Sequence, residues 1–300
     1  MKKDNRSKTR AFPPEPTPEE WACYTDLALE QRNLLLREAP GAPEVEGIQT
    51  RVRLRRDLRT TWIRVSTPEG SAALRKPMGT YVTLEVNPEA LRMKKAQDRL
   101  VRTLAGELAE LMALSPADPV LVVGLGNRKV IYDALGPLTL DQLQVTGHLR
   151  GRLPAEYGPI RSVFAFEPGV LGRTGMETGS LLRAVADALR PAAILAVDAL
   201  AARNRSTLCA TIQLTDTGLV PGSGVTAGRS GLTRESIGIP VFALGVPTIS
   251  TLEQAADFVV TPRSVTREAA LFSGILGRSI NLCLHPSLTE EQLSQAVETT

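Results

Sequence analysis

The chain has 300 residues, of which 43% are hydrophobic and only 4% aromatic, and its formal net charge is +3. That length allows one large α/β domain or two small ones. No apolar run approaches the ~20 residues of a membrane-spanning helix, and no apolar segment follows basic residues 1–10 as it would in a secretory signal. These features predict a cytoplasmic protein with no membrane partner. The first ten residues carry +4 and the other 290 carry −1, so no overall charge indicates direct nucleic-acid binding.

The amino-terminal third predicts a leader followed by a β-rich region. Residues 1–20 are polar and contain four prolines, which predicts a disordered leader before a single α/β domain over 21–300. Thr25 is a candidate cap of a short helix. Alternating residues in 51–55 and 61–65, with a strand at 81–86, predict a β-rich insertion around 48–88. The arginines of 51–55 either form a solvated face that limits aggregation or bind an acidic partner.

The remaining two thirds alternate between apolar strands and amphipathic helices. Strands are predicted at 119–123, 163–166, 192–197, 211–214 and 241–247, and helices at 89–114, 138–145, 177–190, 251–258, 264–281 and 288–298. This order is typical of a doubly wound, mainly parallel sheet with helices on both faces.

Two aspartates follow buried strands and are the main candidates for chemistry. Asp133 lies in a Gly-x-Gly-Asn segment after strand 119–123, and Asp198 directly follows strand 192–197. The carboxyl ends of parallel strands line the ligand crevice of such a sheet. Two carboxyl groups close together cannot both ionise easily, so one retains a proton. Such a pair suits hydrolysis by acid–base catalysis.

Each aspartate also has a structural interpretation. Asp133 could be the N-cap of the following helix, and Asp198 could be the ion partner of Arg203. Gly124 and Gly126 invite a dinucleotide-binding interpretation, but the third glycine of that motif would fall at Lys129. We expect these glycines to let Asn127 enter the crevice and orient a carbonyl or carboxylate.

Other chemistries have weaker support. Ser223 lacks the G-x-S-x-G frame because residues 221 and 225 are Pro and Val, and only His148 and His285 could serve a triad. The three cysteines, at 23, 209 and 283, have no metal-ligand spacing. The aspartates at 26, 133, 198 and 216 could in principle hold a hard cation. We nevertheless predict no metal and no cofactor.

Ordered sequence blocks along nearly the whole chain outside the leader resemble the germination protease family of endospore-forming bacteria. They are 25–30, 126–127, 133–137, 145–149, 168–178, 198–203, 211–218, 221–225 and 245–248. The resemblance implies an atypical aspartic endopeptidase that degrades small acid-soluble spore proteins in the spore core. It implies a homotetramer made as a zymogen, and a fold akin to that of hydrogenase-maturation peptidases.

The resemblance also assigns roles to residues. The two catalytic aspartates correspond to Asp133 and Asp198, and we predict supporting roles for Gly126, Asn127, Thr174 and Arg203. The chain departs from the family pattern at two places, with Ile131-Tyr132 where Thr-Pro is usual and Ala202 where Ser is usual. These departures affect loop geometry and substrate contacts and leave both aspartates in place.

The leader and two alternative functions complete the expectations. The family's substrates are cut after Glu and before a bulky apolar residue and Ala, and this leader contains Glu20-Trp21-Ala22. We therefore predict self-cleavage between Glu20 and Trp21. One alternative function is a metal-sensing maturation peptidase of the related fold. The other is a non-catalytic binding protein that keeps the scaffold.

Overall fold

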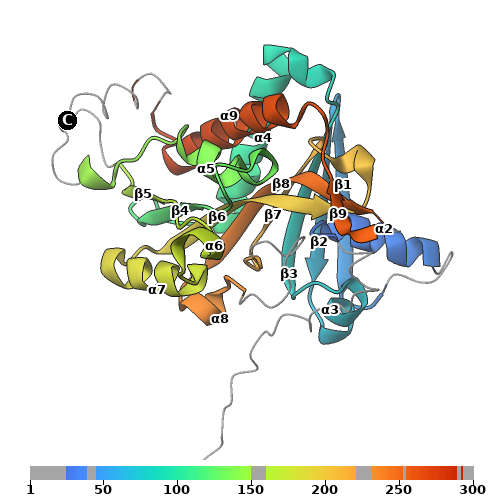
Figure 1. Cartoon of the computed structure of the whole chain (residues 1–300), viewed down its shortest axis with the longest axis horizontal. Coiled ribbons are helices and arrows are strands. Elements are labelled where there is room, and N and C mark those ends of the chain that lie inside the picture. The colour runs from blue at the N-terminus through green and yellow to red at the C-terminus, as the bar shows by residue number, and fades with distance from the viewer. Residues whose placement is uncertain are drawn as a thin grey trace, which may run out of the picture.

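A computed structural model describes residues 25–38, 45–149, 160–220, 231–252, 255–288 and 292. They form an α/β fold around one nine-stranded sheet with the order β1-β2-β3-β7-β8-β6-β4-β5, and β9 pairs with β8 (Figure 1). The strands are β1 (Ile48–Arg55), β2 (Leu58–Val65), β3 (Gly79–Val86), β4 (Val120–Gly124), β5 (Val163–Phe166), β6 (Ala193–Ala202), β7 (Thr211–Thr215), β8 (Val241–Leu252) and β9 (Ala255–Val260).

The sheet is mixed, and the prediction of a mainly parallel sheet was wrong. Strands β8, β6, β4 and β5 are parallel, whereas β1, β2, β3, β7, β8 and β9 are joined by antiparallel pairings. Only Arg56 and Asp57 connect β1 to β2, which is too short for the crossover that parallel strands need. The strands within 48–86 thus extend the one sheet, and whether they form a subregion of their own stays a prediction.

Helices cover both faces of the parallel part, as the alternation of elements predicted. Helices α4 (Lys94–Met112), α5 (Leu135–Leu140) and α9 (Val265–Leu284) lie on one side, and α6 (Leu171–Thr174), α7 (Thr178–Leu189) and α8 (Arg234–Ile237) lie on the other (Figure 1). Along β4, Val120 and Val122 pack into the α4/α9 core, whereas Leu121 and Val123 pack toward Leu182 of α7. The continuous apolar strand is therefore buried on both faces.

A third core lies beneath the antiparallel strands. Helices α2 (Ala28–Glu38) and α3 (Pro68–Leu74) contribute Leu29 and Leu74 to it, against Ile63 and Tyr81 of the sheet. Sequence reasoning missed α3, although its start carries two signals. Thr67 accepts a hydrogen bond from the Gly70 amide, and Pro68 occupies the first turn.

Several predicted elements changed in extent or type. The helices at 89–114, 177–190 and 264–281 are confirmed as α4, α7 and α9, while the helix expected at 138–145 is the shorter α5. The helix expected at 251–258 is wrong, because β8 continues to Leu252 and β9 pairs antiparallel with it. The helix at 288–298 lies largely outside the described residues. None of the described helices has the length and apolar character needed to cross a membrane.

Candidate functional site

Asp198 lies inside β6, at the point where the neighbouring strand β4 stops. Gly124, the last residue of β4, pairs with Val197, so Asp198 is the first β6 residue beyond it. Sequence reasoning placed Asp198 after the end of its strand, but β8 pairs with β6 as far as Ala202 and extends it. Asp198 is only 5% exposed, and its Oδ1 accepts a hydrogen bond of 2.9 Å from the Ala199 amide. The carboxylate therefore lies buried at the strand-end level that the sequence predicted.

Asp133 is half-buried in a 3₁₀ turn, Ile131–Asp133, that precedes α5. The residue that caps α5 is Ala134, without a side-chain cap, so the interpretation of Asp133 as an N-cap was wrong. The Asp133 amide donates to the Val130 carbonyl at 2.8 Å, and Thr248 Oγ1 of β8 donates to the Tyr132 carbonyl at 2.5 Å. The turn also contacts β6, β8 and α9. Strands from the middle of the sheet thus hold the Asp133 turn in place.

Two glycines bring the Asp133 turn against the end of β4. Gly126 has φ +106°, and a Cβ there would collide with the Asp133 carbonyl oxygen and lie 3.0 Å from Asp133 Oδ1. A Cβ on Gly136 would lie 2.5 Å from the Val197 carbonyl oxygen, one residue before Asp198. Only glycine permits both approaches. The connection between β4 and α5 therefore packs closely against β6 next to Asp198. Asp133 and Asp198 both lie near the end of β4.

Asn127 and Thr174, both predicted to support the site, make hydrogen bonds around the Asp133 turn and α6. The Asn127 amide donates to the Asp133 carbonyl at 2.9 Å, and its Oδ1 accepts from the Lys129 amide at 3.1 Å and from Arg173 Nη1 at 3.4 Å. Thr174 Oγ1 donates to the Val170 carbonyl and accepts from the Met176 amide, each at 3.2 Å. Asn127 thus connects the Asp133 turn to α6, and Arg173, which lies within block 168–178, joins the candidate site.

Arg203 lies at the far end of β6, five residues beyond Asp198. Its amide donates to Glu30 Oε2 at 2.8 Å, and its carbonyl accepts from Ser250 Oγ at 3.1 Å. Glu30 is 8% exposed and also accepts from the Asn204 amide and the Thr207 hydroxyl. A carboxylate of α2 therefore satisfies the backbone where β6 ends.

The segment just before α2 is bound to the same face of the sheet as Asp198, which sequence reasoning missed. Asp26 Oδ2 accepts from the Ala201 amide at 2.7 Å, and the Asp26 amide donates to the Ala201 carbonyl at 2.9 Å. Gln213 of β7 accepts from the Ala28 amide at 2.7 Å and donates to the Asp26 carbonyl at 2.8 Å. Leu27 packs on Leu200. We call residues 25–28 the anchor segment.

The register explains why the anchor segment and Asp198 share a face. Asp198 pairs with Gly245, and Gly245 pairs with Gln213, so the three positions form one row across the sheet. Side chains directly opposite each other point to the same side. Gly245 leaves no side chain between the carboxylate and the amide, and a Cβ there would lie 2.6 Å from Leu200 Cγ. The only sequence signal for Gln213 and Gly245 was their position in blocks 211–218 and 245–248, which resemble the germination protease family.

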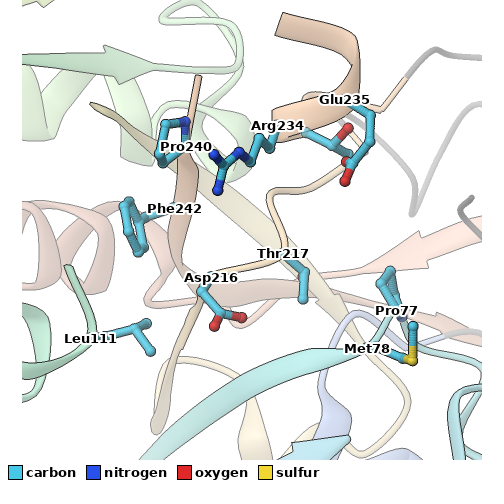
Figure 2. A pocket seen from close by; sticks show the side chains of 10 residues that line it. Pro77, Met78, Leu111, Asp216, Thr217, Arg234, Glu235, Pro240 and Phe242 are labelled. Carbon is cyan, nitrogen blue, oxygen red and sulfur yellow. The ribbon is translucent and has the colours of Figure 1, made fainter. Parts of the chain in front are cut away.

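A separate pocket of about 260 Å³ lies at the opposite edge of the parallel strands, near the start of β8. Figure 2 shows Arg234 of α8 reaching toward Pro240 and Phe242, above Asp216. Asp216 Oδ1 accepts from the Thr80 amide at 2.7 Å. Neither Asp133 nor Asp198 lines this pocket, so it is distinct from the candidate site.

The groups considered for other chemistries are dispersed. In the described part of the chain, no three His, Cys, Asp or Glu side chains are grouped to hold a metal ion. His148 lies in a 3₁₀ turn and His285 is the C-cap of α9. Burial raises the pKa of Cys209 to about 12 and that of Cys283 to about 11. Ser223, Glu20 and Trp21 lie outside the described residues.

Comparison with known proteins shows the class of protein to which the chain is similar. Residues 26–260 match the family model described as germination protease. A germination protease of Caldanaerobacter subterraneus subsp. tengcongensis is 35% identical over 318 residues, covering 90% of this chain and 97% of the relative. One of Clostridium acetobutylicum is 31% identical, covering 91% and 98%, and one of Clostridium tetani is 36% identical, covering 75% and 69%.

The match to the family model spans most of the chain. The similarity covers nearly the full length of the first two relatives and about two thirds of the third. The chain therefore belongs to the germination protease family. It is an endopeptidase, a hydrolase that acts on peptide bonds.

Proposed function

We propose that this endopeptidase degrades small acid-soluble spore proteins in the spore core, with Asp133 and Asp198 as its acid–base pair. The observation that carries the proposal is the placement of both aspartates beside the end of β4. Gly124 pairs with Val197 immediately before Asp198, and Gly126 admits the Asp133 backbone at the same level. Family membership supports a protein substrate.

The chemistry follows from two carboxyl groups that share one proton. The ionised carboxylate takes a proton from a water molecule as that water attacks the scissile carbonyl carbon. The protonated carboxyl donates its proton to the carbonyl oxygen, which gives a tetrahedral gem-diol. The other carboxyl then passes the water-derived proton to the amine nitrogen as the C–N bond breaks, and the first carboxyl recovers a proton from the gem-diol hydroxyl. The Ala199 amide, which donates to Asp198 Oδ1, fixes the orientation of that carboxylate. Held in this way, Asp198 needs little reorganisation during the reaction.

The proposal includes activation by removal of the leader and assembly as a homotetramer. Self-cleavage between Glu20 and Trp21 would release the basic, proline-rich residues 1–20 and leave the anchor segment, which starts at Thr25, intact. Mass spectrometry of the matured protein tests the position of the cut. An amino terminus at any residue other than Trp21 rejects this part of the proposal.

The direct test compares the wild type with Asp133→Asn and Asp198→Asn variants on a purified small acid-soluble spore protein. Asp187→Asn, on the exposed face of α7, is the matched control. Each site variant should lose roughly 10²–10⁴-fold in kcat and keep its circular dichroism spectrum and assembly, while the control keeps full activity. Undiminished turnover in either site variant removes that aspartate from the mechanism.

Two further arms of the experiment separate the alternative functions. Cleavage that persists in a chelator argues against the metal-sensing peptidase. A biological role that survives both Asp→Asn substitutions would instead identify a non-catalytic binding protein. The proposed function predicts that cleavage survives the chelator and that the biological role is lost in both variants.

A further inference from the structure

The hairpin formed by β1 and β2 concentrates positive charge at one end of the sheet. Residues 48–65 contain six arginines and one aspartate, a net charge of +5, although the whole chain carries only +3. β1 is the terminal strand in the order of described strands, and it pairs with β2 without a register shift. Its outer edge therefore presents backbone N–H and C=O groups with no strand beside them in the described part of the chain.

The two faces of β1 differ in chemistry. Arg51, Arg53 and Arg55 point to the face that carries α4, because residues at i and i+2 share a face. Val52 and Leu54 point to the other face and are 45% and 74% exposed. An exposed edge with apolar side chains is a site at which another strand can add.

Two of the three arginines on this face, Arg51 and Arg53, are held by contacts within the protein. Arg51 and Arg53 stack on the Trp62 ring, with guanidinium carbons 4.2 and 4.8 Å from its centroid. Glu107 of α4, only 5% exposed, accepts from Arg53 Nη2 at 2.6 Å and from Trp62 Nε1 at 2.8 Å. Arg51 has no carboxylate partner among the described residues, and neither does Arg55. Cations held in this way lose less side-chain entropy when they bind an anion.

We propose that β1 is a docking strand for an extended acidic segment of the protein substrate, which adds to the sheet edge by β-augmentation. The docked segment would alternate acidic residues, facing Arg51 and Arg55, with apolar residues that cover Val52 and Leu54. The identity of the partner as substrate rests on the proposed function, whereas the binding of such a segment does not. A second copy of the chain would set arginine against arginine, and nucleic acid would leave the exposed apolar residues uncovered.

The topology sets the distance between the docking strand and the candidate site. β1 is five strand positions from β6, and Val52 lies in the same row as Asp198. At ~4.8 Å per strand, the separation is roughly 24 Å. An extended chain covers at most ~3.3–3.6 Å per residue. The acidic segment must therefore lie at least about seven residues from the scissile bond.

Trp62 provides a direct readout of binding. In a Trp21→Phe background it is the only tryptophan of the chain. A peptide of alternating Glu and Val should change its fluorescence saturably, and the binding should weaken as salt rises. A peptide of alternating Lys and Val should not bind. An Arg51→Glu/Arg55→Glu variant should bind the acidic peptide at least tenfold more weakly.

The matched control is Arg37→Glu/Arg183→Glu, which changes the net charge equally at exposed positions on α2 and α7. It should bind the acidic peptide like the parent. Equal weakening in both variants would mean that only net charge matters and would overturn the proposal. Tighter binding of a short DNA duplex than of the peptide would also overturn the proposal. So would a loss of self-association that occurs in the Arg51→Glu/Arg55→Glu variant and not in the control variant.

Cleavage then tests whether the partner is a substrate. A cleavable sequence joined to the acidic segment by a ten-residue linker should have a KM at least fivefold lower than the cleavable sequence alone. A three-residue linker should give no gain, because it cannot span the distance. The Arg51→Glu/Arg55→Glu variant should lose the gain and keep kcat. If the peptide binds but the linked segment has no effect on KM, only the identification of the partner as substrate is rejected. If the peptide causes no change in Trp62 fluorescence, the proposal that β1 is a docking strand is rejected.

Discussion

Gly126 is the residue whose substitution tests the construction of the site most sharply. Gly126→Ala places a Cβ at φ +106°, a region that costs an alanine ~1–3 kcal/mol. The same Cβ would overlap the Asp133 carbonyl oxygen, which must move by roughly 1 Å to restore ordinary contact. Because a displacement of ~1 Å can cost about 10²-fold in rate, we expect kcat to fall by about 10²-fold and stability by ~1–3 kcal/mol.

The control for this prediction is the same substitution in α4. Gly106→Ala adds a Cβ with nothing within 4 Å, inside a helix, where alanine is favoured by ~1 kcal/mol. It should therefore raise the urea midpoint and leave kcat unchanged. Activity of both variants is measured on the spore protein substrate, and stability by urea unfolding. Full activity in Gly126→Ala would show that the position of the Asp133 backbone does not control the reaction.

Three further predictions concern the surroundings of the site. Gln213→Leu should lower the free energy of unfolding by ~2 kcal/mol and speed proteolysis near residue 28, because the substitution leaves a buried amide and a buried carbonyl unpaired; unchanged proteolysis would contradict this. Burial lowers the pKa of His285 to about 4, so the unfolded chain binds a proton first and stability should fall as the pH drops from 6.5 to 4, by at most ~3 kcal/mol. His285→Leu should remove this loss of stability between pH 6.5 and 4. If the stability of the variant and the wild type fell in parallel with pH, His285 would not be its cause. The thiols of Cys209 and Cys283, with pKa values raised by burial, should react slowly with alkylating agents at pH 8 in peptide mapping, and rapid labelling of either would contradict the raised pKa.

Local patterns predicted the elements whose signals are local. The apolar run of β4 and the helical spacing of α4 and α7 identified those elements, because burial on both faces or on one stripe leaves a direct trace in the sequence. Sequence reasoning assigned residues 251–258 to a helix, whereas residues 255–260 form β9. Its antiparallel pairing with β8, in which Ser250 lies opposite Val260, is a cross-strand interaction that helical spacing does not reveal. The antiparallel insertion of β7 between β3 and β8 is likewise invisible to local patterns.

The sequence indicated the two candidate aspartates, but it could not indicate which residues lie around them in the fold. An apolar strand followed by aspartate marked Asp198, since a buried carboxylate is costly without a role, and the glycine-rich segment after β4 marked Asp133. No spacing rule could place Gly245 beside Asp198 or bring Gln213 onto the backbone at Asp26, because those contacts depend on the order and register of the strands.

The most direct test of the central claim is a double-mutant cycle on kcat/KM with Asp133→Asn, Asp198→Asn and the combined variant. Two groups that act on one proton should be strongly non-additive, so the combined variant should be about as slow as the slower single variant. Losses that simply multiply would show that the two aspartates act independently and would contradict the shared-proton mechanism.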